Sequence, residues 1–425
     1  MLRNTLRRNK GITLIALVVT IIVLLILAGI SISMLTGQNG ILNRAAEAKE
    51  KTGIAQEDES QKLKGYEDTI NQYAPSSNGG STGGGSEGGN PTGGSLPTGT
   101  GTTPYLPNST FSKKEGDLAT GLVIQDASQN EYVWVEVPTT IYDNTTYNNN
   151  GAKKPQNADE WEKIRDCLKA YTADYSNSSY KDTDTDGTTY SVDYQNMLKS
   201  VYTNGGFWIG RYEAGLEEGK DPRASYTKIS ASDKAVVKQN KIPYNYVKRD
   251  EAQELATRMN YNGCTSSLIF GIQWDLVLKY IETKEPDQKT NLTSNSTTIG
   301  NYYNSEFTLN RGKFATYNDL SDWKSYNSEE KPTLVTGSQK QAQSSNSNAI
   351  LLTTGATEVT NLQNIYDIAG NVWEWTREFY NTSNPCVSRG GSYFNSSSDY
   401  PAKNHIHGST SYLYFDVGFR LGLWK

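Results

Sequence analysis

Four aspartates in one short stretch are spaced at intervals that suit a bound cation. In the sequence DTDTDGTTYSVD, Asp182, Asp184 and Asp186 take the first, third and fifth positions of a calcium-binding loop, and Gly187 stands at its sharp turn. Asp193 takes the twelfth position, where such loops ordinarily carry Glu. Because hard carboxylate oxygens suit Ca²⁺, this ion is the candidate cofactor. A solvated acidic turn in a loop rich in Thr and Asp is an equal alternative.

The two histidines of the chain, His405 and His407, are separated by one residue. In a strand both rings would lie on one face and could share a metal ion, but no Cys, Glu or third His is close in the sequence, which favours a chance pair. The three cysteines, Cys167, Cys264 and Cys386, are too few for a disulfide framework and lack zinc-site spacing. A phosphate-loop motif (GxxxxGK[ST]) is also missing from the sequence.

The segment that contains both histidines differs from its borders. Between RGGS (389–392) and GFR (418–420), residues 393–416 are mostly Tyr, Ser, Asn, Asp, Phe and His. Aromatic rings supply contact area, and Ser, Asn and Asp supply adaptable hydrogen bonds, as in many binding surfaces. We therefore predict that this segment binds a protein or glycan ligand, through Tyr393, Phe394, Asn395, Ser397, Asp399, Tyr400, Asn404, His405, His407, Ser409, Tyr412, Tyr414 and Asp416.

The N-terminus indicates where these residues are displayed. Four basic residues precede Gly11, and Ile12–Leu35 is almost wholly apolar. A run of ~20 apolar residues is long enough to cross a membrane as a helix, and the positive-inside rule places the remainder of the chain outside the cell. The net charge of −5 and the pI of about 5.4 argue against a nucleic-acid partner.

This N-terminal sequence, KGITLIALVVTIIVLLILAGI, resembles the leader of type IV prepilins in its order of basic residues, glycine and apolar helix. The resemblance implies that a prepilin peptidase cuts between Gly11 and Ile12. Pilins usually carry Glu at the fifth mature position, where this chain has Ala16, and this departure puts assembly with other pilins as a major subunit in doubt. An uncut signal anchor is the alternative reading.

These features divide the chain into five parts. Residues 1–11 form the leader and 12–36 the transmembrane helix, and the charged, helix-favouring stretch 37–74 is predicted to continue as a stalk. Residues 75–103 are rich in Gly, Ser and Thr and are predicted to be a flexible, disordered linker, because they have too little apolar surface to offset the entropy of folding. Residues 104–425 form the head.

The head contains strand-like and helix-like patterns. Short strands are predicted in GLVIQD, EYVWVEVP and FWIGRYEAG, and helices in RDEAQELATRMNY and IQWDLVLKYIE, where apolar residues recur every three to four positions. Segments rich in Asn, Ser, Thr and Gly, at 142–151, 290–304 and 338–348, are predicted to be surface loops. The predicted fold class is α+β with much irregular structure.

Six head segments, taken in order, resemble the formylglycine-generating enzyme (sulfatase-modifying factor) type of the C-type lectin fold: VWVEVP, FWIGRYEAG, IPYNYVKRDEAQELATRMNY, NIYDIAGNVWEWTREFY, SRGGSY and GFRLGL. The resemblance implies that Trp373, Trp375, Phe419 and Arg420 belong to the core and scaffold. The oxidases of that family hold copper with two cysteine thiolates shortly after the RGGS motif, and here no cysteine follows Cys386. We therefore expect no copper and no enzyme activity.

Segment 393–416 also resembles the variable regions of proteins diversified by retroelements, which commonly use this lectin-like fold. There, randomised adenines in AAY codons yield neither Lys, Glu, Gln, Met nor Trp. These five residue types account for 80 of the 425 residues, whereas the segment contains one, Lys403. A binding loop selected in the ordinary way would have a similar composition.

Together these features predict an adhesin- or receptor-like protein of the cell envelope. It would be held by a single membrane span or associated with a pilus, with the head outside the cell. Two alternatives are an oxidase of the formylglycine-generating type, disfavoured by the absent cysteine pair, and a structural minor pilin without a specific ligand.

Overall fold

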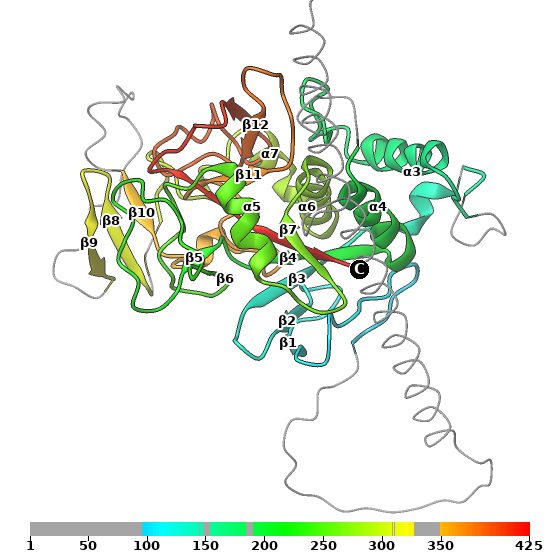
Figure 1. Ribbon diagram of the computed structural model, residues 1–425, viewed down its shortest axis with the longest axis horizontal. Helices are drawn as coiled ribbons and strands as arrows, with labels where there is room; N and C mark the ends of the chain where they lie inside the picture. Colours follow the sequence, from blue (N-terminus) through cyan, green and yellow to red (C-terminus); the bar gives the residue numbers. More distant parts are fainter. Residues whose placement is uncertain are drawn as a thin grey trace, which may run out of the picture. The chain divides into compact units, whose positions relative to one another are not determined.

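A six-stranded sheet organises the described part of the chain (Figure 1). The C-terminal strand lies inside this sheet and pairs antiparallel with two strands that are distant in sequence, so the end of the chain closes the fold. In spatial order the strands are β1 (Ser112–Glu115), β2 (Val123–Gln125), β3 (Glu131–Glu136), β4 (Gly206–Gly210), β15 (Leu421–Trp424) and β7 (Thr265–Leu268).

Three smaller sheets accompany it in the described residues. The four-stranded sheet contains one parallel pair, β11 with β14, and otherwise antiparallel pairs. Its order is β13 (His405–Gly408), β12 (Cys386–Arg389), β11 (Trp373–Thr376) and β14 (Val417–Phe419). The others are β10 (Ile350–Leu352), β8 (Lys313–Thr316) and β9 (Asp319–Ser325), and the pair β5 (Gly215–Leu216) and β6 (Ala235–Val236).

Within the described residues, five α-helices pack around these sheets. They are α3 (Ala158–Tyr171), α4 (Val192–Asn204), α5 (Arg249–Arg258), α6 (Gly271–Lys284) and α7 (Lys289–Thr293), accompanied by the 3₁₀ turns η1 (Thr139–Tyr142), η2 (Pro286–Gln288) and η3 (Glu358–Thr360). The two predicted helices are confirmed as α5 and α6. Helices α3 and α4 were not predicted, although each begins with a cap that the sequence shows: Asn157 accepts from the Glu160 N–H, and Ser191 accepts from the Tyr194 N–H.

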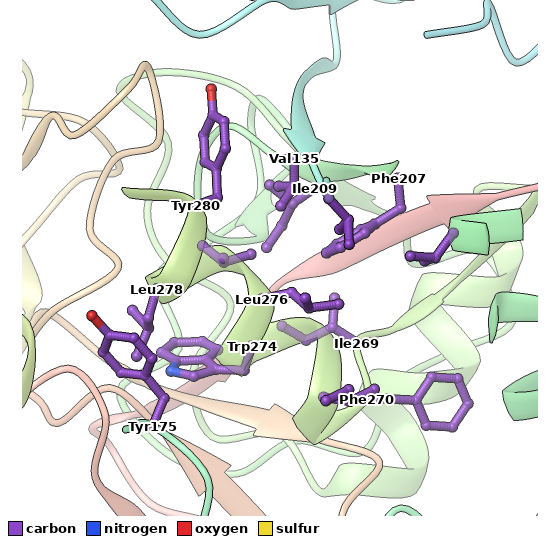
Figure 2. Close-up of a cluster of buried hydrophobic side chains, with 14 of the residues drawn as sticks. Val135, Tyr175, Phe207, Ile209, Ile269, Phe270, Trp274, Leu276, Leu278 and Tyr280 are labelled. Atoms are coloured by element: carbon purple, nitrogen blue, oxygen red, sulfur yellow. The ribbon is translucent and has the colours of Figure 1, made fainter. Parts of the chain in front are cut away.

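Helix α6 lies in the main core, and ten of its 14 residues are buried. Trp274 and Leu278 are fully buried, and Figure 2 shows them near Tyr175, while Leu276 lies toward side chains of β3 and β4 such as Val135. Fully burying one such side chain stabilises the fold by roughly 1.5–3 kcal/mol. The helix therefore provides a rigid base for the residues at its N-terminal end.

The structure describes residues 96–143, 145–147, 154–183, 190–307, 309, 311–326 and 349–425, all of which belong to one compact unit, Gly89–Lys425. Within these ranges no helix has the length and apolarity needed to cross a membrane. The predicted leader, transmembrane helix and stalk lie outside the described residues. The same holds for most of the predicted linker.

Two sequence-based boundaries need correction. Thr102 falls in the predicted linker but is buried, because its hydroxyl donates to the Gly205 carbonyl (3.0 Å) and accepts from the Trp134 indole (2.9 Å). Residues 290–304 are not simply a surface loop: they begin with α7, and both Asn301 and Tyr302 are buried. In each case polar side chains that suggest a loop are used for internal hydrogen bonds.

Candidate functional site

Two buried arginines hold the ends of segment 393–416. Arg389, at the end of β12, donates to Asp275 (2.7 Å) and Glu378 (3.2 Å). Arg420, which follows β14, donates to Glu374 (2.6 Å). Both guanidinium groups are fully buried. Loss of one partner from such a pair leaves the other charge buried without a counter-ion, so both borders of the segment are fixed.

A glycine pair starts the segment. Gly390 and Gly391 have φ angles of 95° and 78°, in the left-handed region that side chains rarely adopt. A Cβ atom on Gly391 would lie 2.5 Å from the Tyr400 carbonyl oxygen and 2.7 Å from the Tyr302 ring. The Tyr302 hydroxyl donates to the carbonyls of Gly390 (2.7 Å) and Tyr400 (2.9 Å). The chain therefore leaves the sheet at a point where only glycine fits.

Four of the thirteen predicted ligand-binding residues lie in the interior: Tyr393 and Ser397 are fully buried, and Phe394 and Asp416 expose only 6% and 8% of their surface. The two aromatic rings pack in a cluster with side chains of the β10–β8–β9 sheet, and the Ser397 hydroxyl donates to Asn295 (2.8 Å). Burial assigns these four residues to the support of the segment. This corrects the sequence-based list, because the alternation of aromatic and polar residues does not say which of them face the core.

The remaining polar positions are more accessible. Asp399 is exposed, whereas Asn395, Asn404 and Ser409 are half-buried. The Asn395 side chain accepts from the Ser392 hydroxyl (2.8 Å), which ties it to the border. Asp399, Asn404 and Ser409 are therefore the polar side chains that are best placed to meet a ligand.

Both histidines lie on one side of β13. The Tyr180 ring stacks on His405 at 4.4 Å and Tyr380 stacks on His407 at 3.8 Å between ring centroids, while the Tyr180 hydroxyl lies 3.1 Å from His407 Nδ1. His405 Nε2 lies 3.2 Å from a Glu378 oxygen, and burial lowers the pKa of His405. Among the described residues no group of three His, Cys, Asp or Glu could hold a metal ion. The histidines share a face, as strand spacing predicts, but they pack with tyrosines.

The first pocket, of about 390 Å³, lies beside the N-terminus of α6. Three buried carboxylates line it: Asp182, Asp275 and Glu378. Asp182 accepts from the backbone N–H groups of Gly271 (2.6 Å) and Ile272 (3.0 Å) at the start of the helix. Burial and the charge of Glu378 raise the pKa of Asp182. All three carboxylates therefore have partners within the fold, and we name this cavity the acidic pocket.

The structure describes two of the four predicted calcium ligands, Asp182 and Asp193. Asp193 lies in the first turn of α4 and pairs with Arg377 (2.8 Å), whereas Asp182 caps α6. Asp184 and Asp186 lie outside the described residues. The calcium site therefore stays a prediction.

The second pocket, of about 350 Å³, lies beside the end of the segment. We name it the aromatic pocket. Phe415 lines it, and the Tyr317 ring, on the turn between β8 and β9, lies 4.9 Å from the Phe415 ring. Next to Phe415, Tyr414 is 48% exposed and its ring is 4.6 Å from Tyr412. The full lining is Ala224, Tyr246, Tyr317, Asn318, Asp319, Leu320 and Phe415.

Sequence reasoning did not find two of the rings in this lining, Tyr246 and Tyr317. Asn318 and Asp319 after Tyr317 are typical turn residues, so a hairpin tip was recognisable. Its position beside Phe415 depends on long-range packing that no local pattern records. Tyr246 adopts a φ of 48°, and its N–H donates to the Tyr414 carbonyl (3.1 Å), which places it at the segment.

Tyr400 and Tyr412 are half-buried because each meets a core tryptophan. The Tyr400 ring lies edge-on to Trp373 (5.6 Å) and Tyr412 lies edge-on to Trp375 (5.8 Å). Both tryptophans are buried, as the family resemblance implies. Tyr414 has no such tryptophan contact among the described residues, so its exposed ring is the most accessible aromatic of the segment.

The three cysteines are free and lie in different elements. Burial raises the pKa of all three thiols, Cys264 to about 12. A raised pKa keeps a thiol protonated, whereas the thiolate is the form that binds copper or acts as a nucleophile.

Residues 287–423 match the family model described as Sulfatase-modifying factor enzyme 1-like domain, a range that contains the whole of segment 393–416 and its borders. No curated protein sequence matches the chain.

Two solved structures show a distant similarity. Treponema denticola variable protein 1 aligns with a TM-score of 0.28 and 13% identity, over 52% of this chain and 85% of its own. The crystal structure of CarF aligns with a TM-score of 0.31 and 13% identity, over 52% of this chain and 87% of its own. The described part of the chain is a mixed helix and sheet structure, and its residues 287–423 are similar to the sulfatase-modifying factor enzyme 1-like domain.

Proposed function

We propose that this chain is a ligand-binding protein whose head, of the C-type lectin type, presents the accessible side of segment 393–416 to a protein or glycan. One observation carries the proposal. Tyr414 is 48% exposed and lies beside Phe415, which lines the aromatic pocket of about 350 Å³. Exposed tyrosine next to a concave, aromatic-lined surface is typical of a binding site, because the ring offers rigid contact area and a hydroxyl group.

The division between fixed borders and an accessible face supports this proposal. Arg389 and Arg420 are fully buried in ion pairs at the borders, whereas Asp399 and Tyr414 are exposed. Changes at exposed positions rarely disturb a fold, so such a segment can vary in sequence while its scaffold stays intact.

An oxidase function is not proposed. The segment that follows RGGS carries Phe, Asn and Ser where the family's copper-binding cysteines would stand. The three thiols elsewhere are free, and burial raises the pKa of each. The chemistry available at the segment is therefore recognition by aromatic and polar contacts.

We further propose that the segment is diversified by a retroelement. The DNA next to the gene tests this proposal. It should contain a reverse-transcriptase gene and a near-copy of the codons for 393–416 that differs at adenines. A neighbourhood with pilus-assembly genes and no such copy would favour the structural minor pilin.

The proposed anchor is a processed prepilin-type helix, with the head outside the cell. N-terminal sequencing of the mature protein should begin at Ile12. A mature protein that begins at Met1 would instead identify an uncut signal anchor.

Calcium is proposed at the loop 182–193. Calorimetry on the full chain should detect Ca²⁺ binding that Asp184→Ala weakens. Equal heats for the parent and this variant would eliminate the site.

A further inference from the structure

A buried carboxylate next to the aromatic pocket has no ion-pair partner among the described residues. Asp416 is buried (8% exposed) directly after Phe415, and its carboxylate accepts hydrogen bonds from the Ser392 hydroxyl (2.8 Å) and from its own backbone N–H. No described basic residue forms an ion pair with it. Burial of a carboxylate without a counter-ion is costly, and no ion pair among the described residues offsets this cost.

The groups around Asp416 connect it to the pocket. Burial raises the pKa of Tyr246, and so do the nearby Tyr317 and the carboxylate of Asp416. Tyr246 and Tyr317 line the pocket, so the buried charge acts on the pocket wall. Tyr393 is fully buried behind them, and its hydroxyl has no hydrogen-bond partner in the described structure.

The lining itself favours a cation. Three aromatic rings and one carboxylate, that of Asp319, face the pocket, and no Lys or Arg is among the described lining residues. The faces of aromatic rings carry negative electrostatic potential and attract ammonium and guanidinium groups.

The guanidinium of Arg223 donates to the backbone of the lining residue Tyr246 and is already engaged. It donates to the carbonyls of Asn245 (2.9 Å), Tyr246 (2.9 Å) and Thr227 (2.5 Å), and it packs over the Tyr244 ring at 5.0 Å. This arginine therefore supports the backbone around Tyr246 and leaves the pocket for another cation.

We propose that the aromatic pocket binds an ammonium group, held by the rings of Tyr246, Tyr317 and Phe415 and attracted by Asp319 and Asp416. The inference rests on the proposed binding function and specifies its ligand chemistry. The group can belong to a lysine side chain of a partner protein or to a small quaternary amine. A desolvated cation over aromatic rings gains roughly 2 kcal/mol or more, which corresponds to at least about tenfold in affinity.

Matched probes test the charge requirement. Choline and 3,3-dimethyl-1-butanol have the same shape, but only choline is charged. Saturation-transfer NMR and titration with the full chain should show choline binding at least about tenfold more tightly than the neutral alcohol. N-acetyl-lysine amide against N-acetyl-norleucine amide forms a second pair, and whichever cation binds more tightly identifies the source of the ammonium group.

Variants locate the binding. Tyr317→Ala should weaken choline binding roughly tenfold. Asp416→Asn should also weaken choline binding, because this substitution removes the negative charge but keeps the shape of the side chain. Tyr326→Ala is the control, because Tyr326 is 40% exposed close to the end of β9 and does not line the pocket. Melting curves confirm that each variant is folded. Should Tyr317→Ala fail to fold, Asp319→Asn and Asp416→Asn provide the same test.

Three results would overturn the inference: no choline binding by the parent, equal binding of the neutral alcohol, or binding that Tyr317→Ala and both aspartate variants leave unchanged. These results bear on the ligand class alone. If natural variation maps to the exposed face of segment 393–416 while choline fails to bind, the binding function stands and the ammonium inference fails. If choline binds but the segment never varies, the diversified-receptor proposal fails instead.

Discussion

The two pockets are similar in volume, about 390 Å³ and 350 Å³, but differ in how their charges are satisfied. In the acidic pocket, Asp275 and Glu378 pair with Arg389, and Asp182 accepts two backbone N–H bonds at the start of α6. Next to the aromatic pocket, the buried Asp416 accepts from the Ser392 hydroxyl and from its own backbone N–H. The carboxylates of the acidic pocket are thus paired or capped, whereas Asp416 has no ion-pair partner among the described residues.

This difference distinguishes the acidic pocket, which supports the fold, from the aromatic pocket, which is suited to ligand binding. Paired buried charges fix the border of segment 393–416, because removing either partner is costly. A buried carboxylate without a counter-ion, next to an exposed tyrosine, is typical of a ligand-binding site. Carboxylates with a shifted pKa occur at both pockets, so a shifted pKa does not distinguish the two pockets. The pairing of the carboxylates with basic residues does.

The largest expected effect is on the acidic pocket. Glu378→Ala removes a carboxylate that pairs with the fully buried Arg389 and contacts His405, so the free energy of unfolding should fall by ~3–5 kcal/mol in urea titrations. Asp319→Asn, on the exposed rim of the aromatic pocket, serves as the control and should unfold like the parent. If Glu378→Ala unfolds at the same urea concentration as this control, the acidic pocket is not a structural support.

A second prediction concerns the pH dependence that Asp416 introduces. Burial raises the pKa of Asp416 to about 6, whereas an unfolded aspartate has ~3.9. The folded state therefore binds this proton more tightly than the unfolded state does. The protonated Asp416 carboxyl contributes ~3 kcal/mol to the free energy of unfolding below pH ~4, and this contribution is lost as the pH rises to about 6.

Asp416→Asn should remove this decline. Urea unfolding of parent and variant between pH 4 and pH 7 measures it (roughly the interval between the two pKa values). The variant should be the more stable of the two at pH 7, and the difference should shrink toward pH 4. A difference that does not change with pH would mean that the Asp416 carboxylate is balanced by a group not identified above.

Smaller effects are expected on the tyrosines. Tyr400→Ala and Tyr412→Ala each remove an edge-on contact with a buried tryptophan, worth ~0.5–1.5 kcal/mol beyond the buried area. Tyr414→Ala should change stability by ~0.5 kcal/mol or less, because the ring is 48% exposed. Melting temperatures rank the three variants. A Tyr414 variant that melts below the other two would place this ring in the core.

The sequence predicted much of the scaffold but fewer of the residues at the candidate functional site. The apolar spacing in α6 and the GNVWEW and GFR segments pointed to a mixed fold with buried Trp373, Trp375 and Arg420. Buried tyrosine and exposed tyrosine look alike in a sequence, so Tyr393 and Tyr414 received the same role although only Tyr414 is accessible.

Long-range contacts explain the other differences. Tyr246 and Tyr317 reach the aromatic pocket from elements about 170 and 100 residues before Phe415, a distance in sequence that no short motif spans. Asp182 caps α6 across 89 residues rather than serving a local turn alone. Each of these contacts joins separate elements, which periodicity within one element cannot predict.

The account's central claim is that a fixed scaffold displays a variable binding face, and natural variation measures this most directly. Sequencing the gene from many cells of one population should reveal amino-acid differences concentrated at accessible positions such as Asp399, Asn404, Ser409, Tyr412 and Tyr414. The replacements should not include Lys, Glu, Gln, Met or Trp, and Arg389 and Arg420 should be constant. Differences spread evenly over the head, or concentrated at buried positions such as Tyr393 and Ser397, would contradict the account.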